Sequence, residues 1–420
     1  MKSLVPHQLY YAHLGLREKV KNDIKQDFLH ALDERKEAEA MIYLHVPFCE
    51  YICGFCPFDR VTDKSSDDTY VDRVKKEVDF YAEKNFVQSL EFTGIHFGGG
   101  TPTSLQHEKL RELIDYVRRK LDAYDAPLHV ESSATTLPDE TIQMFKYEGV
   151  ARTSFGVQSF NPALRRKVGI GATLDDVLST VSRLKKNKMG VHIDLMYGFP
   201  NFGIEGQERI AVDDVKKAIE LGVDSLEFSQ FYPFYSPLEN KILRKGLVFP
   251  SEQEVVDTIL TATDLLEAAG FTQVSEYAFH RNGNVMLEGT YFGNVTDTLA
   301  LGPSSIGRVN GFAYRNITHP RYNTTEAPPI LLMKRTDPKQ EKEWDIASFP
   351  RMLRISKGKV SVEHEPKFKE LLDKGLISDT GNSFELTRKG KCYISDIHLF
   401  LMRGEERMKL KVFEVTSSLS

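Results

Sequence analysis

The stretch Tyr43-Leu-His-Val-Pro-Phe-Cys49-Glu-Tyr-Ile-Cys53-Gly-Phe-Cys56 joins an apolar run to a loop that carries three cysteines. Residues 41–46 are rich in β-branched and aromatic side chains, which predicts a buried strand. The short spacing of the cysteines lets one loop bring three thiolates together. The chain has only 4 cysteines in 420 residues, too few for a disulfide framework, so we expect a metal or cluster site in a reducing compartment.

The cysteine pattern favours an iron–sulfur cluster over a single zinc ion. Zinc sites usually have four protein ligands in two pairs. A four-iron four-sulfur cluster held by three cysteines instead leaves one iron open to a further ligand. Two alternatives stay open here, a zinc site completed by His45 and three loop cysteines without a cluster. The distant Cys392 is expected to be a small buried side chain.

Outward from this loop, short apolar runs alternate with amphipathic stretches. Strands are expected at residues 41–46, 94–97, 128–130, 153–157, 191–196 and 225–231. Apolar residues recur at steps of three and four in residues 110–121 and 174–184, and a further helix is expected at 255–268. This alternation predicts an α/β fold with a parallel sheet, a partial (βα)6 TIM-like barrel whose chemistry gathers at the carboxyl ends of its strands.

Changes in composition and in apolar pattern along the chain suggest four parts. They are an N-terminal helical extension (1–40), the barrel with its C-terminal extension (41–328), a charged and proline-punctuated linker (329–348), and a small domain (349–420). In the last part a helix near 368–372, a strand near 384–387 and a helix near 392–402 predict a winged-helix-like α+β unit. We expect it to cover the substrate.

The cysteine loop, with Phe55 directly before its last cysteine, resembles the radical S-adenosylmethionine (SAM) enzymes. The resemblance implies a four-iron four-sulfur cluster on Cys49, Cys53 and Cys56, and SAM bound to the open iron. Reductive cleavage of SAM then gives a 5′-deoxyadenosyl radical. The block from Tyr43 to Cys49 is similar to the branch with oxygen-independent coproporphyrinogen III oxidase, related haem chaperones and class C radical SAM methyltransferases. The resemblance covers about residues 41–310 and is weaker beyond.

Further motifs fit this resemblance, although each alone also fits local hydrogen bonding. The glycines of Phe97-Gly-Gly-Gly-Thr-Pro-Thr103 expose main-chain groups to a small polar ligand. Carboxylates and amides in core strands are costly unless they are paired. The implied cofactor residues are Gly99, Gly100 and Thr101 at the SAM amino group, Glu131 at the ribose, Gln158 and Asp194 completing the pocket, Tyr43 at the methionine end, Phe55 beside the cluster, and Gly302 and Ser304 near a second ligand.

Three departures from the relatives bear on function. Where relatives carry an arginine for the SAM carboxylate, the register gives Ile170, with Arg165, Arg166 and Lys167 as candidate substitutes. Coproporphyrinogen oxidase has a further cysteine at the position of Phe58, and residues 286–292 lack the haem-chaperone signature.

Because both subfamily signatures are altered, we favour class C methyl transfer to a bulky substrate such as a porphyrin or haem, with one or two SAM molecules bound. The alternatives are a coproporphyrinogen oxidase-like oxidoreductase and a haem-binding chaperone without turnover. The resemblance to radical SAM enzymes also implies an electron donor such as flavodoxin or ferredoxin.

Charge and hydropathy exclude some partners. The formal net charge is -5, so no global positive field attracts nucleic acid. The sequence has no run of about 18 apolar residues, and its first 40 residues lack the apolar core of a secretion signal. We therefore expect a cytoplasmic protein without a membrane span that acts on a small molecule.

Overall fold

The computed structural model describes residues 19–233, 236–281, 297–336, 342–343 and 346–402. Residues 286–292 lie outside the described residues, as do residues 1–18 of the expected N-terminal extension (1–40). No helix among the described residues is long and apolar enough to cross a membrane.

One sheet of twelve strands organises the larger part of the chain, in the order β12-β11-β10-β9-β1-β2-β3-β4-β5-β6-β8-β7. The first six strands are β1 (Ala38–Val46), β2 (Leu90–Gly99), β3 (Leu128–Ser132), β4 (Val150–Gln158), β5 (His192–Tyr197) and β6 (Ser225–Gln230). They pair in parallel in the order of the sequence. The expected six-stranded parallel barrel is therefore confirmed, and it is open because β6 is followed by the antiparallel β8.

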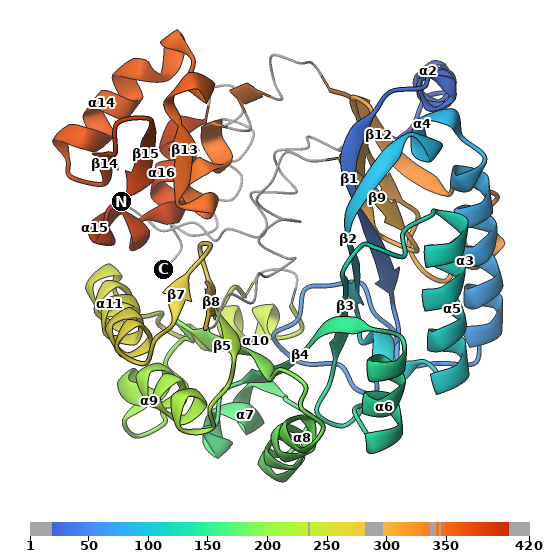
Figure 1. Cartoon of the computed structure of the whole chain (residues 1–420). Helices are drawn as coiled ribbons and strands as arrows, with labels where there is room; N and C mark the ends of the chain where they lie inside the picture. Colours follow the sequence, from blue (N-terminus) through green and yellow to red (C-terminus); the bar gives the residue numbers. More distant parts are fainter. Residues whose placement is uncertain (1–18, 234–235, 282–296, 337–341, 344–345, 403–420) are drawn as a thin grey trace.

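Helices cover the outer face of this curved sheet (Figure 1). They are α2 (Asn22–Asp33), α3 (Asp67–Ala82), α4 (Asn85–Gln88), α5 (His107–Lys120), α6 (Asp139–Tyr147), α7 (Pro162–Val168), α8 (Leu174–Lys186), α9 (Gln207–Glu220) and α11 (Glu252–Ala268). The short α10 (Glu239–Lys245) instead lies next to the cysteine loop, where the amide of Leu238 donates to the carbonyl of Gly54 at 3.0 Å. In α5 the buried Leu110, Leu113, Ile114 and Val117 form the apolar stripe seen in the sequence. The three helices expected at 110–121, 174–184 and 255–268 correspond to α5, α8 and α11.

The sheet continues beyond β1 at one edge and beyond β6 at the other. The additional strands are β7 (Thr272–Gln273), β8 (Ala278–His280), β9 (Asp297–Leu301), β10 (Ile306–Val309), β11 (Phe312–Asn316) and β12 (Ile330–Arg335). Residues 329–348 were expected to be a linker, but β12 occupies residues 330–335 of this stretch. The linker therefore begins later than expected. The apolar residues of β12 pair with β11, and the flanking prolines and charges hid this edge strand in the sequence.

The C-terminal unit has a core of its own. It contains β13 (Arg354–Ser356), α14 (Glu365–Asp373), β14 (Ile377–Asp379), β15 (Ser383–Leu386), α15 (Arg388–Lys391) and α16 (Ile394–Leu401), with the antiparallel order β13-β15-β14. This confirms the expected small α+β fold. Ile346 and Ala347 belong to this core, so the linker is also shorter at its end.

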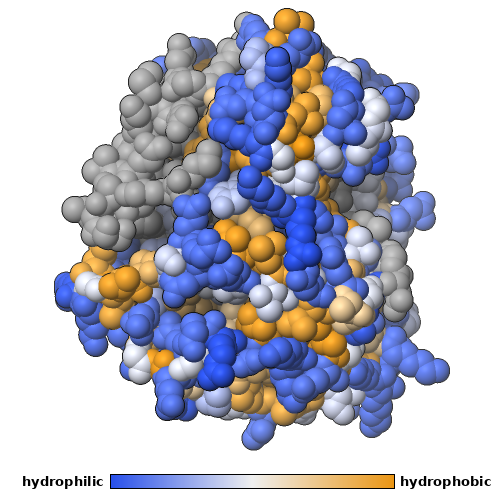
Figure 2. All heavy atoms as spheres, turned by 90° about the vertical axis from the view of Figure 1, so that its left-hand side faces the viewer, coloured by the Kyte–Doolittle hydropathy of each residue, from blue (hydrophilic) through white to orange (hydrophobic). Residues whose placement is uncertain are grey.

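The C-terminal unit stands beside β7, β8 and α11 (Figure 1). Seen from that side, the surface is largely hydrophilic, with apolar patches between the charged groups (Figure 2). Main-chain and side-chain contacts cross the boundary, as described below.

Candidate active site

The cysteine loop is closed at its neck, where residues 47–49 enter the loop and Val61 leaves it. The amide of Cys49 donates to the carbonyl of Val61 at 2.9 Å, and the amide of Val61 donates to the carbonyl of Pro47 at 2.8 Å. At the tip of the loop, the amide of Gly54 donates to the carbonyl of Val168 at 3.0 Å. Main-chain hydrogen bonds therefore hold the loop at the carboxyl end of β1.

Each cysteine sulfur accepts one hydrogen bond, and the donors come from three different segments. The Thr101 hydroxyl bonds Cys49 at 3.6 Å, the Gly171 amide bonds Cys53, and the Phe58 amide bonds Cys56. Such bonds orient thiolate ligands and tune the metal group that they hold. The sequence could not indicate the two amide donors, because a main-chain N–H carries no residue-specific signal.

The electrostatics of the three sulfurs suit a positively charged group. Burial raises the pKa of Cys49 and Cys56. Burial, followed by repulsion from its two neighbours, raises the pKa of Cys53 to about 12. Three thiolates in this loop are thus unfavourable without compensation, which iron ions supply. Among the described residues, no set of three or more His, Cys, Asp or Glu side chains converges on a single metal ion. Three cysteines in one loop are the protein ligands that a four-iron four-sulfur cluster takes when one of its irons is left open.

His45 does not act as a free fourth ligand. Its Nδ1 accepts a hydrogen bond from the Tyr43 hydroxyl at 3.1 Å, and its Nε2 donates to the carbonyl of Asp59 at 3.1 Å. Burial lowers the pKa of His45, which keeps the ring neutral. The structure therefore argues against the zinc alternative with His45 as a ligand.

The glycine motif lies directly against the cysteine loop. The amide of Gly100 donates to the carbonyl of Val46 at 2.8 Å, and the amide of Thr101 donates to that of Phe48 at 2.7 Å. Gly99 has a φ of +104°, and a Cβ there would lie 2.4 Å from the His45 ring. Only glycine fits this close approach. The structure thus brings Gly99, Gly100 and Thr101 beside the cysteines, while their contact with SAM stays a prediction.

Glu131 is held at the end of β3 by two donors. Its Oε2 accepts from the Gly99 amide at 3.1 Å, and its Oε1 accepts from Nε2 of the buried His96 at 2.8 Å. The side chain is still 35% exposed. Each carboxylate oxygen can therefore accept a further hydrogen bond, as a ribose hydroxyl would require.

Gln158 and Asp194 come close together on neighbouring strands. Gln158 ends β4 with a φ of +63°, an uncommon conformation for a residue with a side chain. A Cβ on Gly156 would lie 2.5 Å from Nε2 of Gln158, so the amide folds back over that glycine. Asp194 of β5 pairs in register with Gly156. The structure therefore gathers these two predicted residues at one level of the barrel.

Gly302 and Ser304 connect β9 to the neck of the cysteine loop. The Gly302 amide donates to Glu77 at 2.9 Å, and burial raises the pKa of Glu77 to about 7. The Ser304 hydroxyl donates to the carboxylate of Asp59. These contacts are structural, and the second ligand expected here stays a prediction.

Arg165, one candidate for the SAM carboxylate, is committed to the main chain. Its guanidinium donates to the carbonyls of Val157 at 2.6 Å and Ser159 at 2.9 Å, and also to that of Ala172.

The other candidates lie around the same turn. Arg166 and Lys167 are exposed on α7. Ile170 and Phe55 pack against an apolar cluster that includes Leu164. The arginine missing at position 170 is therefore not replaced by Arg165.

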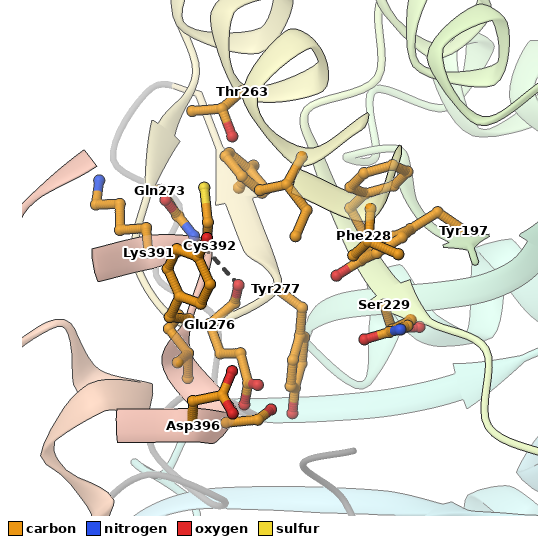
Figure 3. Close-up of a pocket in the computed structure, with 17 residues that line it drawn as sticks. Tyr197, Phe228, Ser229, Thr263, Gln273, Glu276, Tyr277, Lys391, Cys392 and Asp396 are labelled. Carbon is orange, nitrogen blue, oxygen red and sulfur yellow. Dashed lines mark hydrogen bonds between the residues drawn. The ribbon is translucent and has the colours of Figure 1, made fainter. Parts of the chain in front are cut away.

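Several cavities among the described residues lie away from the cysteines. One of about 510 Å³ lies between α9 and α11. A smaller one of about 60 Å³ lies between the barrel and the C-terminal unit, where Cys392 and Asp396 face Tyr197 and Glu276 (Figure 3). Cys392 is partly exposed here rather than fully buried. Because their lining residues do not include the cysteine loop, these cavities are not part of the candidate site.

Comparison with known proteins points to one family. The profile of the Radical SAM superfamily matches residues 43–229. Anaerobilin synthase of Escherichia coli O157:H7 is 26% identical over 374 residues, which cover 85% of this chain and 82% of that protein. Heme chaperone HemW of Lactococcus lactis is 28% identical over 370 residues, which cover 83% of this chain and 93% of that protein. The solved structure of coproporphyrinogen III oxidase (HemN) from Escherichia coli has a TM-score of 0.77 at 20% identity and covers 96% of this chain and 99% of that one.

The matched segment contains the three cysteines, the glycine motif and the residues predicted on β3, β4 and β5. The likeness to HemN extends the common fold through the C-terminal unit. Residues 43–229 therefore match the radical SAM superfamily, whose cofactors are a four-iron four-sulfur cluster and SAM, and the chain resembles the branch of the coproporphyrinogen oxidases and haem chaperones.

Proposed function

We propose that this protein is a radical SAM oxidoreductase that acts on a tetrapyrrole, either a porphyrin or haem. The observation that carries this proposal is a continuous hydrogen-bonded connection at one end of the sheet. It runs from Cys49 through Thr101 and the adjoining glycines to Glu131. When bound, the cluster and SAM supply a 5′-deoxyadenosyl radical, and the protein supplies orientation and a dry pocket.

Each candidate residue has one proposed task. Cys49, Cys53 and Cys56 hold the cluster, and Thr101 orients the first of these sulfurs. Glu131, already positioned by two donors, accepts the ribose hydroxyls.

The remaining residues complete the SAM pocket. Gly99 and Gly100 expose main-chain groups to the SAM amino group, while Gln158 and Asp194 form the neighbouring wall. Tyr43 and Phe55 flank the methionine end and the cluster.

A planar apolar substrate suits the surface beside the cysteines. Ile52 is 48% exposed and Phe58 is 41% exposed, and both belong to the cysteine loop. Exposed apolar side chains next to a functional site commonly mark a binding surface. The names of the relatives, which refer to haem and coproporphyrinogen, support the same substrate class.

Methyl transfer, the reaction favoured by the sequence, is not supported by these relatives. The preference rested on Phe58 and on residues 286–292, and the latter lie outside the described residues. The names of the similar proteins point instead to oxidation or haem carriage. A haem carrier without turnover is the second candidate, favoured by the match over 93% of HemW.

The C-terminal unit is the proposed cover of the site, and a flavodoxin or ferredoxin is the proposed electron donor. A cover would keep water and protein groups away from the radical. Replacing both Arg351 and Arg388 by alanine, at the boundary of the unit, should leave SAM binding unchanged and raise 5′-deoxyadenosine formation without substrate turnover. Unchanged coupling would remove this role.

The decisive experiment is anaerobic turnover of the reconstituted protein with methyl-labelled SAM, dithionite, and haem, protoporphyrin IX or coproporphyrinogen III in turn. We expect one tetrapyrrole to increase 5′-deoxyadenosine formation and to give an unlabelled product oxidised at a side chain. The Cys53→Ala variant is the control without a cluster.

Other outcomes have clear meanings. Stoichiometric haem binding in the Soret region without 5′-deoxyadenosine would establish the carrier. Methyl label in the product would restore methyl transfer. No response to any tetrapyrrole would overturn the proposed substrate class.

A further inference from the structure

The chain that returns from the cysteine loop places one cation against that loop. This residue is Arg60, four positions after Cys56. Its guanidinium donates hydrogen bonds to the carbonyls of Cys53 and Phe58, which lie on either side of Cys56 in the chain. The positive charge is therefore held at the part of the loop that carries the last two cysteines.

The main chain on both sides of Arg60 is fixed. The carbonyl of Asp59 accepts from His45 at 3.1 Å, and its carboxylate accepts from Ser304. On the other side, Val61 pairs with the segment that leads into Cys49. The backbone at position 60 therefore has little freedom, and its side chain is directed over the loop.

The guanidinium of Arg60 is only partly used by the protein. One Nη donates to the carbonyl of Cys53 at 3.4 Å, a long hydrogen bond, and the other donates to the carbonyl of Phe58. The Nε is buried and has no hydrogen-bond partner among the described residues. A buried donor without an acceptor is costly, which favours an incoming anion at this position.

Arg165 provides the contrast. Three main-chain carbonyls already surround its guanidinium, so a further anion would have to displace them. Arg166 and Lys167 are exposed on α7. Of these four cations, Arg60 alone combines a buried Nε that has no hydrogen-bond partner among the described residues with a contact to the main chain of the cysteine loop.

We propose that Arg60 binds the carboxylate of SAM, taking the place of the arginine that this chain lacks at position 170. A guanidinium can receive a carboxylate through two parallel hydrogen bonds, which fixes its orientation as well as its charge. The inference rests on SAM binding at the three cysteines and does not depend on the tetrapyrrole substrate.

The test is anaerobic equilibrium dialysis of the cluster-loaded protein against SAM and against decarboxylated SAM, without tetrapyrrole. Arg60→Gln should weaken SAM binding by about 10- to 100-fold and leave the affinity for decarboxylated SAM unchanged. Arg60→Lys, which keeps the charge but not the fork, should fall between Arg60→Gln and the native protein. Arg166→Gln is the matched control and should bind both compounds like the native protein.

Iron and sulfide content is measured for every variant. If Arg60→Gln binds no cluster, the affinities of Arg60→Lys for SAM and decarboxylated SAM are compared with those of the native protein instead. Equal weakening of both compounds would show that Arg60 only supports the loop and would overturn the proposal, as would unchanged SAM binding. Because no tetrapyrrole is present, these results cannot be confused with a failure of the proposed substrate class.

Discussion

The cysteine loop and the C-terminal unit adjoin the same sheet, but they are attached to it differently. The loop is closed by main-chain hydrogen bonds between Cys49, Val61 and Pro47. The boundary of the C-terminal unit has a main-chain hydrogen bond from the amide of Glu276 to the carbonyl of Arg351 at 3.0 Å, and it adds contacts between charged side chains, Arg351 with Glu276 and Arg388 with Asp264.

The difference suggests a division of labour. Main-chain hydrogen bonds do not depend on pH in the physiological range, so the loop keeps its geometry under changing conditions. Charged contacts respond to pH and salt. We therefore expect the cofactor end to be rigid and the attachment of the C-terminal unit to be adjustable.

The largest expected effect is at the rigid end. Cys53→Ala should abolish the cluster, because two thiolates cannot replace three at its corners. Iron, sulfide and visible absorbance after anaerobic reconstitution measure this loss. Cys392→Ala, outside the loop, should load like the native protein, and a fully loaded Cys53→Ala protein would contradict the site.

A smaller but still large effect is expected from pH at the boundary. Burial raises the pKa of Glu276 from 4.5 to about 7, although Arg351 acts in the opposite direction. As the pH rises from 4.5 to 7, the unfolded chain releases this proton while the folded chain keeps it, so the folded state loses stability. The loss approaches about 3 kcal/mol above pH 7.

Glu276→Gln should remove this part of the pH dependence. Urea unfolding at pH 5 and pH 8 measures it, and the variant should gain stability over the native protein mainly at pH 8. The exposed Glu267→Gln on α11 serves as the control. If the free energy of unfolding of Glu276→Gln changed with pH as much as that of the native protein, Glu276 would not be the group responsible for the pH dependence.

The sequence predicted the parts of the molecule that depend on local patterns. The period of apolar residues indicated α5 and α8, and the alternation of elements indicated the six parallel strands. Residue types also indicated Glu131 and Gln158, because a carboxylate or amide in a core strand is costly unless it is paired, although local hydrogen bonding alone would also explain each of them. These signals are carried by neighbouring residues, so they survive without a structure.

Features that depend on distant contacts could not be predicted. β12 forms an edge strand only because β11 pairs with it, so its sequence resembled a linker. The donors from Gly171 and Phe58 to the cysteine sulfurs are main-chain groups. The occupation of Arg165 by carbonyls required the fold of α7 and the following turn.

A moderate effect is expected at Glu131, the residue proposed to bind the ribose of SAM. Glu131→Gln keeps the shape but removes the charge, so SAM affinity should fall by about tenfold. Equilibrium dialysis measures it, with the exposed Glu50→Gln as a control from the cysteine loop itself. Equal affinity in the Glu131 variant would remove the ribose contact from the site.

The smallest effect should come from the exposed ion pair of the boundary. The side chains of Arg388 and Asp264 are 58% and 52% exposed, and an Nη of Arg388 lies 2.5 Å from Oδ1 of Asp264. Pairs of this kind contribute less than about 1 kcal/mol and weaken with salt. Arg388→Ala should therefore barely change urea unfolding, like the control Lys216→Ala, which breaks an exposed pair within α9.

The two variants should differ in catalysis rather than in stability. If charge adjusts the attachment of the C-terminal unit, Arg388→Ala should increase 5′-deoxyadenosine formed without product, and added salt should do the same to the native protein. Lys216→Ala should not change that ratio, because its ion pair does not cross the boundary. Identical ratios in both variants would mean that this pair does not help to close the site, and the adjustable attachment would then rest on Glu276 and Arg351.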